Sequence, residues 1–440
     1  DVYKQLLKGV VYHHSGLIPI LKEIIEILYA RGLIKLLFAT ETFAVGVNMP
    51  AKTVIFNDLQ KYDNNGLRFL RTDEYLQMSG RAGRRGLDKN GTVIILPTMD
   101  LPEYATLKNV MSGKSPSIQS KFVPSYQFIL KALHNNDISV DKFIKTTLFS
   151  KEEGIKIKQL EDKLKGLPEM EYPFDENNKN LKDIQDYLRL EKKLNNKVIR
   201  LNNKDRKKAL KRIKQLEKSE EFQESLKIMK EWEYKNEERE KVINEIEYMK
   251  SYVLKDVEKI IEILRDGYLD KDDKLTEKGL IAIEVNDCNP IIFTELIYSK
   301  YLEECTFEEI VGLLGAFIDE KSRDFHYMGL RELGKEKELT DKVIDLLYYL
   351  DDEMGYLEKI EKEKKFEIQQ NNDYQLKLDF VLPAYMWAKG CKINDIYTCT
   401  DIYEGNFVRG ILRINSMVED IINVAENLGY FKLKKIIEID

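Results

Sequence analysis

Two short apolar runs, at residues 33–38 and 53–56, constrain the fold of the N-terminal part of the chain more than any other feature. Each has the length and composition of a buried β-strand. Polar and small residues follow the first run, at residues 39–42 and 46–50. In open sheets of parallel strands, ligands bind at the carboxyl ends of the strands. The sequence therefore predicts an α/β domain with a ligand-binding edge close to these polar residues.

A cluster of three glycines and three arginines lies farther along, in the sequence QMSGRAGRRG at residues 77–86. Glycine lets a backbone approach a ligand closely and take unusual dihedral angles. Arginine keeps its charge at any working pH, and its planar fork matches the oxygens of a phosphate group. Considered alone, the cluster could equally be a basic turn in solvent. Beside the predicted ligand-binding edge, it favours a site for a polyphosphate whose charge shifts during a reaction.

Together the two segments resemble a known family of enzymes. The sequence ATETFAVGVNMPAKTVIF at residues 39–56 is similar to motif V of superfamily-two helicases, and QMSGRAGRRG is similar to motif VI. More narrowly, both resemble the superkiller-like, exosome-associated DExH-box RNA helicases, which they match without a gap or a conflicting residue. The resemblance implies that residues 1–104 form the second RecA-like helicase lobe, truncated at its N-terminus. It also implies ATP and Mg²⁺ as cofactors, both of which need the missing first lobe.

By the same resemblance, five residues are candidates for the nucleotide site. Arg84 matches the arginine finger, which stabilises charge on the transferred phosphoryl group, and Arg81 is its partner on the γ-phosphate. Gln77 contacts the nucleotide or links it to the RNA site. Gly46 and Asn48 are implied to lie at the interface between the lobes, near the ribose and the phosphates. The candidate catalytic residues are therefore the two arginines and the glutamine.

Four residues of the N-terminal part are candidates for contact with RNA. The segment HHSGL at residues 13–17 resembles the stretch after helicase motif IV that lies against the nucleic-acid backbone. The resemblance implies contacts by His14, Ser15 and Gly16, and by Thr40 in motif V. A metal site at the paired histidines is disfavoured, because adjacent residues on a strand point to opposite faces.

The C-terminal third of the chain is predicted to be helical, and it contributes two more RNA-binding candidates. Arg409 and Arg413 are four residues apart, so they share one face of a helix. The surrounding sequence resembles the helical-bundle domain of the exosome-associated helicases, in which such a helix crosses the RNA channel as a ratchet. That family has an acid three residues after the arginine that Arg413 matches, whereas Ser416 stands here. The alternative is a pair of surface arginines that bind nearby acids such as Glu404.

A β-hairpin is predicted between the two helicase motifs. Residues 59–70 contain Asn65-Gly66 between short alternating runs, and this dipeptide is typical of a tight hairpin turn. In the resembled family, a hairpin at this position separates the strands of a duplex. An ordinary surface hairpin is the alternative.

The remaining domain boundaries follow from composition and from the resemblance. Residues 105–150 and 256–286 are expected to form the two parts of a winged-helix domain. Between them, residues 151–255 are rich in charge and poor in glycine, which predicts a helical stalk. Its segments 181–201 and 205–234 have heptad-like apolar spacing and are expected to form a helical hairpin. The small β-barrel fist that tips the stalk in the family has no counterpart in this sequence.

The predicted fold is thus an α/β partial RecA-like lobe followed by a mainly α region. That region is a winged helix interrupted by a helical stalk, then a C-terminal helical bundle with the ratchet helix at residues 287–440. The net charge of −6 does not indicate a nucleic-acid-binding protein. Between residues 192 and 218, however, twelve Lys or Arg stand against two Asp or Glu. These cations are either the solvated face of a coiled coil or an electrostatic footprint for RNA.

Two motifs that a complete helicase needs do not occur in the sequence, namely the phosphate-binding GxxxxGK[ST] loop and the DExH string. The 440 residues alone are therefore expected not to hydrolyse ATP measurably. We interpret them as the C-terminal portion of an ATP-dependent 3′–5′ RNA helicase that feeds RNA to an exosome-type degradation or processing machine. The alternative is a non-catalytic RNA-binding or scaffold subunit derived from such a helicase.

Other features of the sequence limit its setting. The first residues lack both an initiator Met and the pattern of a signal peptide, so the chain is expected to begin inside a longer protein. No apolar run has the length of a membrane span. Four cysteines without a CxxC pair indicate reduced thiols rather than a metal site. We expect an intracellular protein that acts as a monomer within a larger complex, without contact with a membrane.

Overall fold

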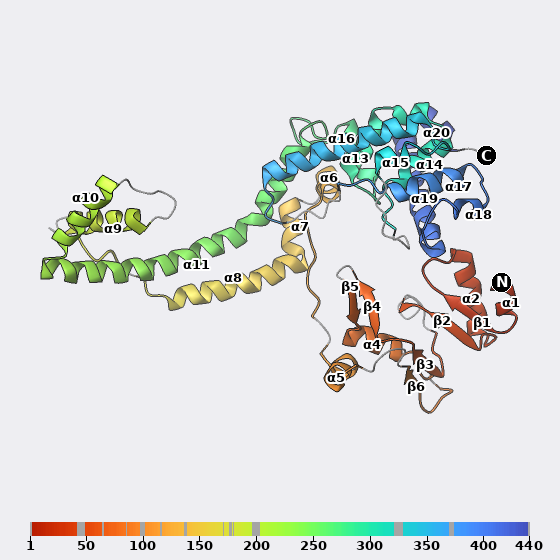
Figure 1. Ribbon diagram of the computed structural model, residues 1–440, viewed down its shortest axis with the longest axis horizontal. Coiled ribbons are helices and arrows are strands. Elements are labelled where there is room, and N and C mark those ends of the chain that lie inside the picture. Colours follow the sequence, from red (N-terminus) through yellow and green to blue (C-terminus); the bar gives the residue numbers. More distant parts are fainter. Residues whose placement is uncertain are drawn as a thin grey trace. The chain divides into compact units, whose positions relative to one another are not determined.

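The computed structural model describes residues 2–41, 49–63, 66–84, 86–96, 102–114, 117–135, 139–169, 171–175, 178, 180–195, 203–320, 329–368 and 374–438. The chain divides into two compact units (Figure 1). Unit one consists of Asp1–Gln119, Ser125–Asn136 and Ile260–Asp440, and unit two consists of Ser120–Pro124 and Asp137–Lys259. In sequence, unit two is therefore an insertion within unit one.

The N-terminal part of unit one alternates helices and strands. Its elements are α1 (Val2–Leu6), β1 (Val10–His13), α2 (Pro19–Ala30), β2 (Leu36–Ala39), β3 (Thr53–Phe56), β4 (Gln60–Asp63), β5 (Gly66–Phe69), α4 (Thr72–Ser79), β6 (Thr92–Ile95) and α5 (Tyr104–Ser112). Strand β1 pairs with β2, and β3 pairs with β6, in both cases in parallel. The second predicted strand is confirmed as β3, whereas β2 covers only the end of the first predicted run. The expected burial is wrong for most of their residues, since Leu36, Phe38 and Ile55 are exposed. Parallel pairing with helices between the strands fits a partial RecA-like lobe.

Helix α2 illustrates how the sequence determines these elements. Pro19 occupies its first turn, where the missing N–H of proline costs no hydrogen bond. Gly32 follows the helix with a φ of +71°, a conformation that favours glycine. The apolar side of α2 buries Ile25 in a small core with Val11 of β1 and Leu17. This core holds the first helix–strand pair of the lobe together.

The predicted hairpin is confirmed as the pair of strands β4 and β5. They run antiparallel, with Asp63 opposite Gly66. Gly66 has a φ of +113°, which a residue with a side chain rarely adopts. Asn65, in the predicted turn, lies outside the described residues. Whether the hairpin separates nucleic-acid strands stays a prediction.

The rest of unit one is helical. Its elements are α6 (Tyr126–His134), α12 (Glu277–Glu284), α13 (Pro290–Tyr298), η1 (Tyr301–Glu304), α14 (Phe307–Gly315), α15 (Leu330–Leu333), α16 (Asp341–Lys364), η2 (Leu378–Phe380), α17 (Val381–Ala388), α18 (Ile393–Ile396), α19 (Glu404–Leu428) and α20 (Phe431–Ile437). Among the described residues from 287 onwards no strand occurs, which confirms the predicted helical character.

Three glycines let the helices of this region pack at close range. A Cβ atom on Gly315 of α14 would lie 2.7 Å from the Phe380 carbonyl oxygen, and one on Gly410 of α19 would lie 2.2 Å from the Phe380 ring. Gly312, one turn before Gly315, approaches Tyr385 of α17 in the same way. Phe380 is 1% exposed, so its ring has no free space into which to move. The junction of α14, α17 and α19 therefore depends on the absence of side chains at these positions.

A short turn leads into α12. Leu269 and Leu275 form an isolated antiparallel bridge, and the Asp270 N–H donates to the Lys274 carbonyl at 2.8 Å. Thr276 then caps α12 with its side chain. This order of helix, short paired turn and helix is the one expected of the second winged-helix part. The winged helix as a domain stays a prediction, and its expected first part is divided, since α6 belongs to unit one and α7 to unit two.

Unit two is built of helices around a core of its own. Its elements are α7 (Val140–Thr146), α8 (Leu148–Gly166), α9 (Leu181–Asn195), α10 (Asn203–Leu216) and α11 (Glu220–Leu264), of which the last continues into unit one. The core combines apolar side chains of α9, α10 and α11, which are Ile184, Tyr187, Leu188, Leu216, Phe222, Leu226 and Met229. That the unit serves as a stalk stays a prediction.

The segment at residues 205–234, expected to be one arm of a helical hairpin, is instead divided between two helices. Helix α10 ends at Leu216 and α11 begins at Glu220. The Ser219 side chain accepts the backbone N–H of Phe222 at 3.3 Å, and this contact caps the new helix. The break lets Leu216 and Phe222 join the same core.

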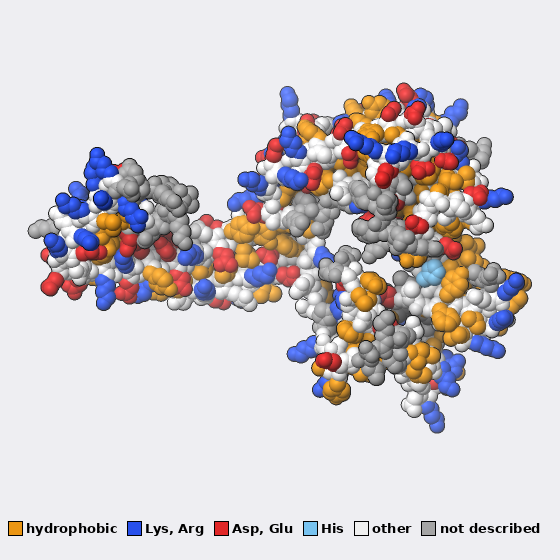
Figure 2. Space-filling view, viewed as in Figure 1, with side chains coloured by type: hydrophobic (Ala, Val, Ile, Leu, Met, Phe, Trp, Pro, Cys, Tyr) orange, Lys and Arg blue, Asp and Glu red, His pale blue; other side chains and the backbone are white. Residues whose placement is uncertain are grey.

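Helix α10 presents a row of lysines to solvent. Lys204, Lys207, Lys211 and Lys214 recur every three or four residues, so they share one face, and all four are exposed. Figure 2 shows Lys and Arg side chains over the end of unit two that carries α9 and α10. This part of the charge run is therefore solvated, and its use as an RNA footprint stays a prediction.

Replacing Gly410 with Ala is expected to destabilise the protein by about 1 to 3 kcal/mol, because the added methyl group would overlap the buried ring of Phe380. The free energy of unfolding, measured by urea titration with circular dichroism, tests this. Gly355→Ala is the matched control, since no atom lies within 4 Å of a Cβ added there on α16. The control is expected to be neutral or to stabilise by up to about 1 kcal/mol. Equal stabilities of the two variants would contradict the packing argument.

Candidate nucleotide and RNA sites

Main-chain hydrogen bonds join the loop after α4 to the segment before β3. The Ala51 N–H donates to the Arg81 carbonyl at 2.8 Å, and the Gly83 N–H donates to the Ala51 carbonyl at 2.7 Å. At this point Ala51 and Ala82 form an isolated parallel bridge. The segment QMSGRAGRRG is therefore fixed against the end of the segment ATETFAVGVNMPA, its neighbour in the resemblance to helicase motifs.

Two glycines make this close approach possible. Gly83 has a φ of +94°, and Gly91 lies so close that an added Cβ would be 2.3 Å from the Ala82 carbonyl oxygen. From the sequence, the glycines of the cluster were assigned to the approach of a ligand. The structure gives Gly83 a different physical reason, since the loop must take a left-handed turn and let Gly91 pass beside it.

Arg84 is held by a carboxylate four residues away. Its Nε donates to Asp88 Oδ2 at 2.8 Å, its Nη2 donates to Oδ1 at 3.1 Å, and its backbone N–H also donates to Oδ2 at 3.0 Å. These hydrogen bonds lower the pKa of Asp88 to about 2. The Arg84 side chain remains 45% exposed, so one side of the guanidinium faces solvent. Asp88 was not among the residues predicted from the sequence, although an acid four residues after an arginine is a recognisable ion-pair spacing.

The remaining nucleotide candidates are positioned unequally by the structure. Gln77 is exposed on the last turn of α4, and Arg81 is partly buried just beyond the end of that helix. Gly46 and Asn48 lie outside the described residues. The structure thus brings Gln77, Arg81 and Arg84 together on one short segment, and it supplies no geometry for the other two.

The candidate RNA-binding residues after β1 contact the helix α19. A Cβ on Gly16 would lie 2.2 Å from the Gly405 Cα, so the two backbones touch. Arg409 Nη1 donates to Ser15 Oγ at 3.4 Å. The Gly16 N–H donates to His14 Nδ1 at 3.1 Å, which leaves the ring proton of neutral His14 on Nε2. Burial, followed by the nearby charges of His13, Lys22 and Arg409, lowers the pKa of His14, so the neutral ring is favoured.

Arg409 and Arg413 have separate partners. Arg409 Nη2 donates to Glu320 Oε2 at 2.9 Å and to Asn406 Oδ1 at 2.7 Å. Arg413 Nη2 donates to the backbone carbonyl of Asp287 at 3.3 Å. Thr40 follows β2, where its N–H donates to the His13 carbonyl at 3.2 Å. The structure therefore groups His14, Ser15, Gly16 and Arg409, with Thr40 bonded to the adjacent strand residue, while Arg413 contacts a different loop.

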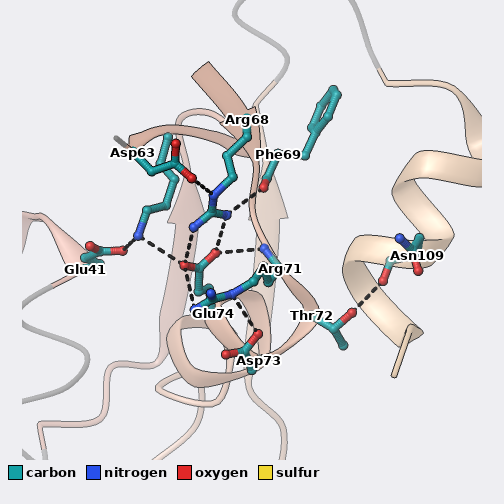
Figure 3. Close-up of polar contacts among 10 residues, drawn as sticks. Glu41, Asp63, Arg68, Phe69, Arg71, Thr72, Asp73, Glu74 and Asn109 are labelled. Carbon is teal, nitrogen blue, oxygen red and sulfur yellow. Dashed lines mark hydrogen bonds and ion pairs between the residues drawn. The ribbon is translucent and has the colours of Figure 1, made fainter. Parts of the chain in front are cut away.

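A cluster of charged side chains joins the hairpin to α4, and Figure 3 shows Glu74 at its centre. The two Glu74 oxygens accept from Arg68 Nη1 and Nη2, both at 2.8 Å, and from Lys61 Nζ at 3.1 Å. The Arg71 N–H at the start of α4 also donates to Glu74, at 2.8 Å. Arg68 in turn donates from Nε to Asp63 at 2.6 Å. Both strands of the hairpin are thus bound to one carboxylate on the helix.

The Glu74 carboxylate is 10% exposed and stays ionised. Its hydrogen bonds to Arg68, with those to the Arg71 backbone and to Lys61, lower its pKa to about 2 against the opposing effect of burial. From the sequence, Asp73-Glu74 was examined only as a possible DExH string and rejected. The sequence held only a weak signal for the role of Glu74. It is an acid at the third position of a helix, where it can accept the first backbone N–H groups.

The described residues hold no candidate metal site. Among the described residues, no group of three or more His, Cys, Asp or Glu is arranged to hold a metal ion. All four cysteines are free thiols. In the part of the chain that the structure describes, no helix has both the length and the apolar character needed to cross a membrane.

Acidification is expected to loosen the hairpin through Glu74. Its pKa is about 2 in the folded chain and about 4.5 when unfolded, so its contribution is fully present above pH 4.5 and is lost as the pH falls toward 2. After allowance for solvent screening, this contribution is on the order of 2 kcal/mol. Unfolding measured from pH 6 to pH 2.5 should show a weaker pH dependence in Glu74→Gln than in the parent. Glu41→Gln, which changes a more exposed partner of Lys61, is the control and should follow the parent.

Two family models match parts of the chain that contain the candidate residues. A family model described as "Helicase conserved C-terminal domain" matches residues 3–86, and a model described as "DSHCT (NUC185) domain" matches residues 272–439. The first contains both helicase-like motifs and the hairpin. The second contains α12 to α20, and with them Arg409 and Arg413.

Similar curated proteins are RNA helicases or superkiller proteins by name. Superkiller complex protein 2 of Homo sapiens is 52% identical over 140 residues, which are 32% of this chain and 11% of the relative. Antiviral helicase SKI2 of Saccharomyces cerevisiae is 50% identical over 140 residues, again 32% and 11%. ATP-dependent RNA helicase mtr4 of Schizosaccharomyces pombe is 46% identical over 161 residues, 36% of this chain and 14% of the relative.

The aligned part of this chain spans only about a tenth to a seventh of the length of these relatives. The two family models lie in the same order as the motifs and the helical region derived from the sequence. Both family models and these relatives therefore support the resemblance of the chain to a C-terminal portion of the superkiller-like, superfamily-two DExH-box RNA helicases.

Proposed function

We propose that the chain is the C-terminal portion of an ATP-dependent RNA helicase that unwinds RNA in the 3′–5′ direction. It supplies half of the ATP site and one wall of an RNA path, and by itself it does not hydrolyse ATP. The parent protein delivers RNA to an exosome-type degradation or processing machine, within which it acts as a monomer. The names of the relatives support ATP and RNA as ligands, and the family resemblance supports the direction and the partner.

The observation that carries this proposal is the fixed position of the Arg81–Arg84 loop. Hydrogen bonds to Ala51 and the contact of Gly83 with Gly91 hold the loop, and the Arg84 side chain is left half-exposed. A preorganised arginine that faces solvent is suited to stabilise charge on a phosphoryl group brought by another lobe. A scaffold subunit would have no need of this arrangement.

Asp88 gives the arginine a partner while no phosphate is near. The bidentate hydrogen bond fixes the guanidinium plane and prevents it from folding onto the surface. When a first lobe closes with ATP and Mg²⁺ in its phosphate-binding loop, Arg84 exchanges Asp88 for phosphate oxygens. Arg81 and Gln77, on the same segment, then approach the γ-phosphate and the nucleotide, with Gly46 and Asn48 near the ribose.

For RNA, we propose that the group formed by His14, Ser15, Gly16 and Arg409 contacts the backbone, together with Thr40. Neutral His14 has its ring proton on Nε2, so it donates a hydrogen bond to a phosphate without adding charge. Arg413 touches RNA farther along the face of α19. Residues 105–150 and 256–286 form the winged helix in this proposal, residues 151–255 form the stalk without a fist, and residues 287–440 form the helical bundle with the ratchet helix.

The decisive test uses Arg84→Ala in the complete two-lobed protein. We expect ATP turnover to fall by about 10³-fold or more, because one phosphate-stabilising cation is lost in the transition state. RNA binding, measured by fluorescence anisotropy, should change less than about twofold, since Arg84 does not contact RNA in this proposal. Arg31→Ala, which removes an exposed arginine that follows helix α2, is the control for loss of charge alone.

Equal losses of turnover and of RNA binding in Arg84→Ala would indicate structural damage and would contradict the assigned role. Turnover by the 440 residues alone, clearly above a protein-free blank and stimulated by RNA, would contradict the proposed division of the ATP site. RNA binding by a parent protein without any ATP turnover would favour the scaffold alternative.

A further inference from the structure

The contacts of Glu74 exceed what the cap of a short helix requires. At this position an acid needs only the backbone N–H of Arg71, which it binds at 2.8 Å. Yet Glu74 also binds Lys61 on β4 and Arg68 on β5, one cation from each strand of the hairpin. It is nearly buried, so these bonds are shielded from solvent and stronger than a surface ion pair. Figure 3 shows all of these contacts converging on the one carboxylate.

Two edges of the Arg68 guanidinium group are bound by carboxylates. Its Nη1 and Nη2 bind Glu74 while its Nε binds Asp63, the last residue of β4. A guanidinium held by two carboxylates at once has little freedom to rotate. Asp63 is the last residue of β4 and Arg68 lies on β5. Their ion pair, together with the bonds of Arg68 to Glu74, therefore sets the orientation of the hairpin relative to α4.

Lys61 extends the same network to the other candidate motif. Its Nζ contacts Glu74 at 3.1 Å and also binds Glu41, which is the last described residue before position 49. One lysine of the hairpin is thus bonded to the segment ATETFAVGVNMP through Glu41 and to the helix before QMSGRAGRRG through Glu74. The hairpin has a charged contact with both segments that the proposed function places at ATP.

Helix α4 is short enough to act as a single rigid piece. Glu74 lies in its first turn, Gln77 lies one turn later, and the helix ends at Ser79, immediately before Gly80 and Arg81. Tyr75 fixes the helix to the lobe by stacking on Phe56 of β3, with ring centres 5.1 Å apart. Helix α4 thus connects the arginine loop at its end to Glu74 in its first turn, and Glu74 connects the helix to both hairpin strands.

From this geometry we infer that Glu74 is a positioning residue that couples the nucleotide-binding loop to the hairpin. This inference rests on the proposed function and adds a residue that no motif assigns. When the loop moves toward or away from phosphate, the clamp of Glu74, Arg68 and Lys61 moves the hairpin with it. Without the clamp, ATP is hydrolysed but the hairpin does not move. The number of base pairs opened per ATP then falls, while the rate of ATP hydrolysis does not.

The test compares two rates in the complete two-lobed protein. In Glu74→Gln, RNA-stimulated ATP turnover should stay within about twofold of the parent, while base pairs opened per ATP fall by about tenfold or more. Glutamine keeps the size of the side chain and removes the charge that holds both cations. Asp73→Asn is the matched control, since it removes a charge from the same turn, and among the described residues its recorded ion-pair partner is Arg71, not the hairpin.

A double-mutant cycle identifies the partner. If Glu74 acts through Arg68, the double variant Glu74→Gln with Arg68→Gln loses no more unwinding per ATP than either single variant. Arg68→Lys keeps the charge but removes the fork, and it should lose most of the coupling while the fold, checked by circular dichroism, is unchanged.

Three results would overturn the inference. Parallel loss of ATP turnover and unwinding in Glu74→Gln would mean that the residue only supports the fold. Unwinding per ATP equal to that of the parent would mean that the clamp does not couple the two. A parent without RNA-stimulated turnover would refute the proposed function itself, which separates that failure from the other two.

Discussion

The two main-chain hydrogen bonds at Ala51 hold together the parts of the lobe on which the rest of the candidate chemistry depends. They form only because Gly83 adopts a left-handed conformation and Gly91 leaves room beside it. So close an approach of two backbones tolerates no side chain, since a single methyl group at Gly91 would overlap the Ala82 carbonyl oxygen. The same device recurs at Gly410, where a missing side chain admits an aromatic ring.

Each cation proposed to meet a ligand already has an acidic or polar partner. Asp88 binds Arg84, and Glu320 binds Arg409, with the pKa of Glu320 raised chiefly by burial. A phosphate must therefore displace a carboxylate rather than fill an empty site, which lowers affinity but favours exchange between partners. Such exchangeable contacts suit a machine that binds and releases its ligands in every cycle. They contrast with the contacts of Glu74, whose donors belong to the three protein residues Lys61, Arg68 and Arg71.

Local sequence signals predicted local structure well. Strand β3 occupies the predicted residues 53–56, and Gly66 of the predicted turn begins β5, which pairs with β4. Partners brought together from distant parts of the chain were not predictable, because no periodicity links Arg409 to Glu320 or Lys61 to Glu41. The break between α10 and α11 was not predicted for a related reason. The heptad spacing continues across it, and the cap by Ser219 is favoured over a continuous helix only when Leu216 and Phe222 pack in one core. The candidate nucleotide-binding residues were predicted from a motif, whereas the carboxylate partner of Arg84, Asp88, was found only in the structure.

The contact between Ser15 and Arg409 also bears on how the chain is made. These residues are 394 positions apart in sequence. At about 5 to 20 residues per second, a ribosome needs roughly 20 to 80 s to synthesise the chain between them. During that interval the HHSGL segment has been synthesised but α19, which contacts it, has not. The contact therefore closes a loop of 394 residues. Assembly of the surface proposed to contact RNA is thus a late event of biosynthesis.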